Sequence, residues 1–184
     1  MTRLGVVGAA LAIVLAVGLV LALRGGSSSD KPVAHVGGEP ITTSQLEAVV
    51  AHFRTEAQQE GKPFPAESTD AGRRTRNKLL GLLVYRVELR QAARRRGITV
   101  APLQVLKRLQ VSAGSEEANR DSFAYGSAET QLLFEAIFSK VTSNVKAPNR
   151  TELAARRNAA MTGFVTRLQR EATVRYEPGY APGS

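Results

Sequence analysis

Residues 79–93 read LLGLLVYRVELRQAA, and this stretch determines most of what the sequence says about the fold. Its apolar residues cover most of the circumference of an α-helix instead of forming a single stripe: Leu79, Leu80, Leu82, Leu83, Val84, Val87, Leu89, Ala92 and Ala93. A helix of this kind packs against neighbours on more than one side. We therefore predict a central helix over residues 70–96, with Gly97 as its C-cap.

A hairpin and a helix are predicted before this central helix. Residues 33–36 and 39–41 flank the pair Gly37-Gly38, which supplies the positive φ angles of a two-residue hairpin turn. Pro40 confines the second strand to the edge of a sheet. Thr42 and Gln45 match a capping box, so we expect a helix over residues 43–60.

Three more helices and a strand are predicted after the central helix. Pro102 suits the first turn of the third helix, residues 110–126 are expected to be mostly loop, and Ser127 is expected to cap the fourth helix. Asn149 and Glu152 can cap the fifth helix. Residues 173–176 alternate as a final strand, whose available partner is the N-terminal hairpin.

The expected fold class is therefore mainly α. It has about five helices and a small antiparallel sheet that joins the N-terminal hairpin to the C-terminal strand. We expect this domain to span residues 33–177 and a disordered tail to span residues 178–184.

The N-terminal segment has a different character. Residues 4–23, from Leu4 to Leu23, contain no charge and would span about 30 Å as a helix, the thickness of a bilayer core. We predict a transmembrane signal anchor over residues 1–24, followed by a flexible tether over residues 25–32. Val20-Leu21-Ala22 is a poor small-x-small cleavage site, so we favour an uncleaved anchor over a secreted, cleaved protein.

The composition excludes several kinds of chemistry. The chain has no cysteine, which excludes disulfides, Cys-ligated metals and thiol catalysis. Its two histidines, His35 and His52, have no carboxylate at ligand spacing from both, and no catalytic or phosphate-binding motif occurs. The adjacent acids Glu116, Glu117 and Asp121 are expected to be solvated. We expect no enzyme, no catalytic residue, no cofactor and no metal site.

Two surface features have two interpretations each. The chain carries a net charge of +9, with arginine clusters at 73–76, 94–96 and 156–157. We favour solvated helix faces over an anion-binding face, and no stacking aromatics lie among the arginines, so no nucleic-acid partner is expected. Phe134 and Phe138 either pack under the fifth helix, which we favour, or form a client-binding surface.

The order of these elements resembles the N-terminal domain of the SurA- and PrsA-type extracytoplasmic foldases, which often carry a parvulin prolyl isomerase. The resemblance rests on the opening VAHVGGEPIT (residues 33–42) with Leu46, on residues 79–93 followed by GITV (residues 97–100), and on the closing apolar residues Phe164, Leu168, Ala172, Val174 and Tyr176. In the family the isomerase domain precedes the closing helix. Here that place holds only the break at residues 142–150, which cannot hold a domain of roughly ninety residues. Ala101 stands where the family often has a Ser or Thr cap.

The resemblance implies a membrane-anchored extracytoplasmic chaperone that binds unfolded or nascent secreted polypeptides without isomerase activity. The cell-membrane location would be single-pass, with the N-terminus cytoplasmic, and the basic domain would be drawn to an anionic membrane surface. The residues that bind peptide cannot be assigned from sequence. The alternative is an adaptor, a structural subunit of a membrane-associated complex that binds one dedicated partner.

Overall fold

The computed structural model describes residues 30–110 and 123–182. The chain divides into two compact units, Met1–Lys31 and Pro32–Ser184. The predicted anchor, most of the tether and the acids Glu116, Glu117 and Asp121 lie outside the described residues, so the expectations for them stay predictions. Within the described ranges, no helix combines the length and the apolar character needed to cross a membrane.

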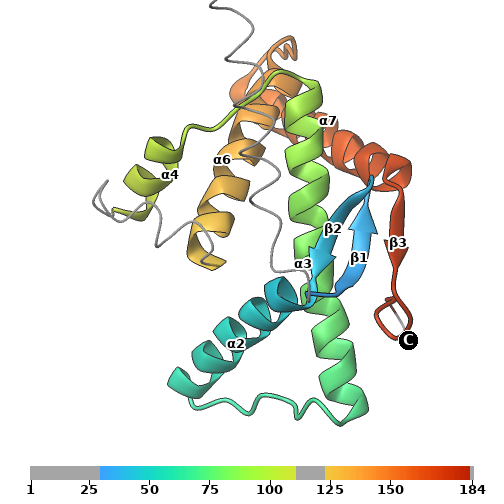
Figure 1. Cartoon of the computed structure of the whole chain (residues 1–184). Coiled ribbons are helices and arrows are strands. Elements are labelled where there is room, and N and C mark those ends of the chain that lie inside the picture. Colours follow the sequence, from blue (N-terminus) through green and yellow to red (C-terminus); the bar gives the residue numbers. More distant parts are fainter. Residues whose placement is uncertain (1–29, 111–122, 183–184) are drawn as a thin grey trace, which may run out of the picture. The chain divides into compact units, whose positions relative to one another are not determined.

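The three strands of the second unit form one antiparallel sheet in the order β2-β1-β3. They span β1 Pro32–Val36, β2 Glu39–Thr42 and β3 Val174–Tyr176. Gly37 and Gly38 form the hairpin turn with φ angles of 54° and 85°, as the sequence predicts. Pro40 lies opposite His35 on the edge strand β2. Figure 1 shows β3 returning beside β1, so the predicted pairing of the last strand with the hairpin is confirmed.

Five helices lie in the described part of the chain, which is mainly helical, as predicted. They are α2 Thr43–Gln59, α3 Asp70–Arg95, α4 Pro102–Leu109, α6 Phe123–Thr142 and α7 Arg150–Glu171. The capping box of Thr42 and Gln45 is formed at the start of α2, and the Asn149 side chain accepts the backbone N–H of Glu152 at the start of α7. Both predicted caps are confirmed.

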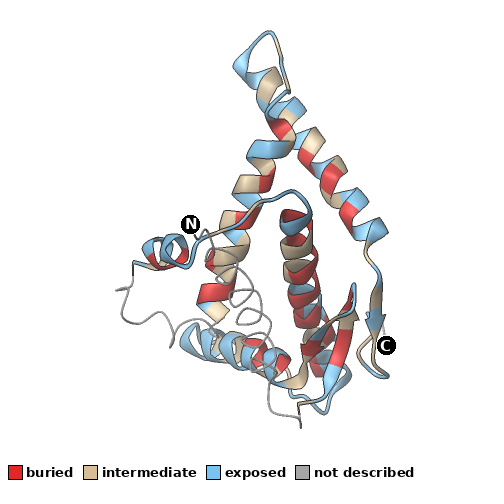
Figure 2. Cartoon of the chain, turned by 45° about the horizontal axis from the view of Figure 1, so that its top comes forward, coloured by how far each residue is buried: buried red, intermediate tan, exposed pale blue. Residues whose placement is uncertain are grey.

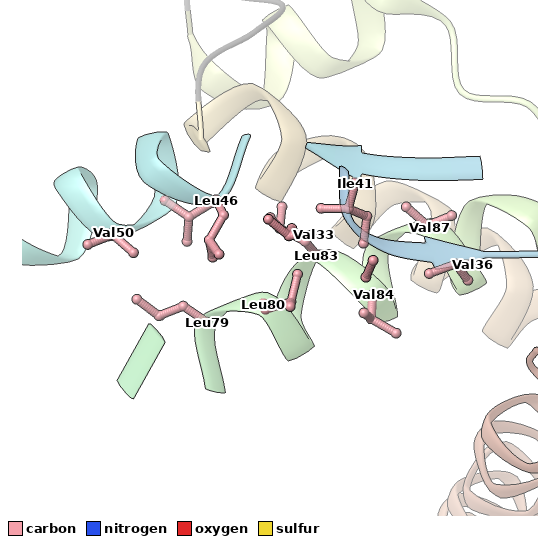
Figure 3. Packing of buried hydrophobic residues seen from close by; sticks show 12 residues of the cluster. Val33, Val36, Ile41, Leu46, Val50, Leu79, Leu80, Leu83, Val84 and Val87 are labelled. Atoms are coloured by element: carbon pink, nitrogen blue, oxygen red, sulfur yellow. The ribbon is translucent and has the colours of Figure 1, made fainter. Parts of the chain in front are cut away.

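Helix α3 contacts two separate groups of buried side chains, so its prediction as a central helix is confirmed. One side packs with the hairpin and α2 in the cluster that Figure 3 shows, where Val33, Ile41, Leu46 and Leu80 are almost fully buried. The other side packs with α6 and α7. The residues of this second cluster are Leu89, Ala92, Ala93, Leu133, Ile137, Met161, Phe164 and Leu168.

The start of α6 differs from the prediction. The helix already includes Phe123, so Ser127 lies inside it and is not its N-cap. The reason is tertiary packing: Tyr125 and Ala128 are buried against Val105 and Leu106 of α4, which extends the helix into a segment whose sequence is polar. The rest of the predicted loop, residues 111–122, lies outside the described residues.

The tail after β3 also differs from the expected disorder. Tyr180 packs against the first core cluster, and the Arg76 guanidinium lies 5.1 Å from the centroid of its ring. The Asn77 side-chain amide donates a hydrogen bond to the Ala181 carbonyl at 3.1 Å. These contacts hold the described part of the tail against α3.

Candidate functional site

An aromatic cluster lies where α2 and α6 meet. The rings of His52 and Phe123 are stacked with centroids 4.3 Å apart, and Phe53 meets Phe123 edge-on at 5.3 Å. His52 is exposed and Phe53 and Phe123 are half-buried. Phe123 was missed because it falls in the segment predicted as loop.

The face of α3 beside this cluster carries an exposed leucine. The Arg86 guanidinium lies 5.6 Å from the centroid of the Phe123 ring, and burial, together with the nearby Arg90, lowers the pKa of Arg86 below its ordinary value. Leu82 precedes Arg86 by one helical turn and therefore lies on the same face. Its side chain is 45% exposed. We call Leu82, His52, Phe53 and Phe123 the junction surface.

The junction surface is open because the buried residues of α2 all lie in the first half of the helix. Its buried residues are Leu46, Val49 and Val50, and none follows them. Figure 2 shows the remainder of α2 as mostly exposed. The wide apolar arc of α3 is therefore covered by the sheet and α2 on one side, and it reaches solvent at Leu82.

A second exposed apolar side chain lies on α6. Phe138 is half-buried against the second core cluster, as the favoured interpretation predicts. Phe134 is 36% exposed, so that interpretation is wrong for this residue. The two lie one turn apart on one face, and the contact with the second cluster covers Phe138 better than Phe134. Leu103, on α4, is a third exposed apolar side chain, at 51%.

The arginine clusters are largely engaged within the domain. In the first cluster Arg73 pairs with Asp70, and Arg76 pairs with Glu47. Arg94 contacts Glu39 at 2.8 Å, a carboxylate that also lies 3.3 Å from Arg90. The Arg76 pair links α3 to α2 and the Arg94 pair links α3 to the hairpin, so part of the basic charge predicted to be simply solvated has a structural role.

The remaining arginines of the clusters have varied surroundings. Arg96 lies over the Phe164 ring at 4.6 Å, and Arg156 pairs with Glu152 at 2.5 Å. Exposed ion pairs contribute little stability individually, about 0–1 kcal/mol. Because these ion pairs partly neutralise the arginine clusters, the clusters do not form one uninterrupted anion-binding face.

The two histidines do not form a metal site. His35 Nδ1 lies 3.7 Å from Glu177 Oε1, whereas His52 stacks on Phe123. No group of three His, Asp or Glu side chains within residues 30–110 and 123–182 has the arrangement of a metal site.

A small pocket lies between the hairpin turn, α3 and the end of α7. Its volume is about 190 Å³. We call it the hairpin pocket; it is lined by Gly37, Glu88, Gln91, Arg95, Leu168, Glu171, Ala172 and Thr173. Glu88 is only 6% exposed, and burial raises the pKa of its carboxyl above the ordinary value. A single acid inside the apolar arc of α3 is the sequence signal for this site.

The buried Glu88 carboxyl makes the stability of the domain depend on pH. A raised pKa in the folded state means that the folded chain holds this proton more tightly than the unfolded chain. The contribution of Glu88 to stability is therefore fully present below its pKa in the unfolded chain. It is lost as the pH rises through its pKa in the folded chain. We expect Glu88→Gln to raise the melting temperature at pH 8 and to leave it unchanged at pH 4. Thermal unfolding followed by circular dichroism measures this, and an equal effect at both pH values would contradict it.

The model of the SurA-like N-terminal domain family matches residues 3–120, more than half of the 184 residues. The chain belongs to this family. A search of the curated proteins finds no match to the chain. The resemblance seen in the hairpin and the central helix is therefore confirmed.

The SurA-like match includes the hairpin, α2, α3 and α4, and it ends before α6. It thus contains Leu82, His52, Phe53 and Glu88. Phe123 and Phe134 lie beyond it. The family is of the chaperone type, which fits apolar side chains that remain exposed on an otherwise well-packed domain.

Proposed function

We propose that this protein is a membrane-anchored extracytoplasmic chaperone that holds unfolded or nascent secreted polypeptides and carries out no catalysis. The observation that carries the proposal is the junction surface. There Leu82 and an aromatic cluster from two other helices remain accessible beside the main core. Unfolded chains expose apolar side chains, and burying one of them gains about 1.5–3 kcal/mol. Membership of a chaperone-type family supports this use of the surface.

The proposed location rests on the N-terminal sequence. Residues 4–23 are long and apolar enough to anchor the chain, with the N-terminus cytoplasmic and the folded unit outside. The net positive charge of the chain favours contact with anionic headgroups. Protease added outside intact cells should digest the folded unit, and complete protection would contradict this location.

The proposed absence of isomerase activity rests on the connection between α6 and α7. Helix α6 ends at Thr142 and α7 begins at Arg150. In the foldases that this chain resembles, an isomerase domain precedes the closing helix. The short connection supports a chaperone that only binds.

The proposal is tested by aggregation of two unrelated secreted proteins after dilution from denaturant. Residues 31–184 should slow the aggregation of both, and the effect should persist at moderate salt, because apolar contacts are not screened. Suppression that is lost with salt would assign the activity to the arginines instead. No suppression at a molar excess would contradict the proposal, and co-purification with a single protein at fixed stoichiometry would identify an adaptor.

A further inference from the structure

The hairpin pocket contains a buried acid without a partner. No hydrogen bond or ion pair to the Glu88 carboxylate occurs among the described residues, although the residue is only 6% exposed. A carboxylate in this position loses part of its hydration and gains no counter-ion. Glu88 therefore has an unmet requirement for a cationic or hydrogen-bond-donating partner.

A second acceptor lies beside Glu88. The Gln91 side-chain nitrogen donates a hydrogen bond to the Val36 carbonyl at 2.8 Å. Its Oε1 atom faces the turn, because a Cβ placed on Gly37 would lie 2.7 Å from it. The absence of a Cβ at Gly37 thus lets this oxygen approach the turn. The pocket therefore contains two carboxylates, those of Glu88 and Glu171, and the amide oxygen of Gln91.

The charge of the pocket opposes that of the whole chain. The chain carries +9, but the pocket is lined by two acids, Glu88 and Glu171, and one base, Arg95. Arg95 is exposed and follows Glu88 by two helical turns, about 10 Å along the axis. It makes no ion pair with Glu88 among the described residues. The structure therefore leaves a site of net negative charge open at the end of the hairpin.

We propose that the hairpin pocket binds a lysine or arginine side chain of the polypeptide that the chaperone holds. The cationic group would pair with Glu88 and the Gln91 oxygen, while the aliphatic stem would lie against Leu168. A space of about 190 Å³ accommodates such a side chain. The assignment of the cationic group to a bound polypeptide rests on the proposed function. The preference of the pocket for a cationic group does not.

The first test uses the full chain in a mild non-ionic detergent and the probe N-acetyl-lysine methylamide. The neutral norleucine analogue has the same stem and is the matched control. Amide NMR signals of Gly37 and Gln91 should shift with the lysine probe and not with norleucine. Glu88→Gln should weaken probe binding by about tenfold, and Arg95→Gln should strengthen it by about threefold. Equal binding to Glu88→Gln, or weaker binding to Arg95→Gln, would overturn the proposal.

The pH dependence gives an independent readout. The charged and titratable groups facing Glu88 are Tyr85 on the same helix, Tyr176 on β3, Arg95 and Glu171. A bound cation favours the ionised carboxylate, so the probe should bind more tightly as the pH rises from 4 to 8. Glu88→Gln should remove most of this dependence. Binding that does not change with pH in the unmodified protein would contradict the assignment to Glu88.

A second experiment separates this inference from the proposed function. An unfolded secreted protein is compared before and after acetylation of its lysines, which removes their charge. Acetylation should weaken binding to the unmodified chain by about threefold and should not affect binding to Glu88→Gln. Equal binding of both client forms to the unmodified chain would overturn this inference and leave the proposed function standing. A failure to bind either form would contradict the proposed function itself.

Discussion

Replacing Leu82 of the junction surface by glutamine is expected to raise the concentration needed to suppress client aggregation about tenfold. Leu82 is 45% exposed, so its replacement costs little in the fold. The change removes an apolar contact worth about 1.5 kcal/mol, which corresponds to roughly a tenfold change in affinity. Glutamine is a good helix former, so α3 should remain intact. Aggregation followed by light scattering over a range of chaperone concentrations measures the effect.

Leu103→Gln is the matched control for this prediction. Leu103 is more exposed than Leu82, and it lies on α4, which contributes no residue to the junction surface. The control variant should suppress aggregation as well as the unmodified chain. If Leu103→Gln impairs suppression as strongly as Leu82→Gln, exposed apolar area in general is responsible, and the junction surface is not the binding site.

The second large effect concerns two glycines of α3. A Cβ at Gly72 would lie 2.0 Å from the Ala66 carbonyl oxygen and 2.9 Å from the Glu67 Cα, both backbone atoms. Gly72→Ala must therefore displace the segment before the helix, and we expect a loss of about 2 kcal/mol in the free energy of unfolding. Gly81 is exposed in the same helix, with open space around its Cβ position. Gly81→Ala should stabilise the protein by about 0.5–1 kcal/mol.

Urea unfolding of the two variants measures whether the free energy of unfolding falls for Gly72→Ala and rises for Gly81→Ala. Because they make the same chemical change in one helix, the difference between them isolates the close approach of the backbone at Gly72. A Gly72→Ala variant as stable as Gly81→Ala would show that the segment before α3 does not pack as described.

The elements that the sequence predicted well are those specified by local chemistry. The Gly37-Gly38 turn, the capping box of Thr42 and Gln45, and the Asn149 cap each satisfy backbone requirements within a few residues. The span of α3 could also be predicted, because its apolar residues are contiguous in sequence, although the C-cap is Arg96, one residue before the predicted Gly97. The membrane anchor is equally local in its signal and stays a prediction.

The features that were missed depend on contacts between distant segments. The start of α6 is set by Tyr125 packing on α4, which no local pattern reveals. The exposure of Leu82 depends on how much of α3 is covered by α2, and that of Phe134 on how much of α6 is covered by α7. Hydrophobic periodicity within one helix does not show how far a neighbouring helix covers it. The order in the tail likewise comes from Tyr180, which contacts residues more than ninety positions away.

The binding role of the junction surface is tested most directly by finding where an unfolded polypeptide contacts the domain. A photo-crosslinking amino acid placed at position 82 would be compared with the same group at position 103, using two unrelated unfolded secreted proteins. We expect crosslinks to both clients from position 82 and few from position 103. Crosslinking of equal strength from both positions, or crosslinking to neither client, would contradict the claim that the junction surface binds unfolded chains.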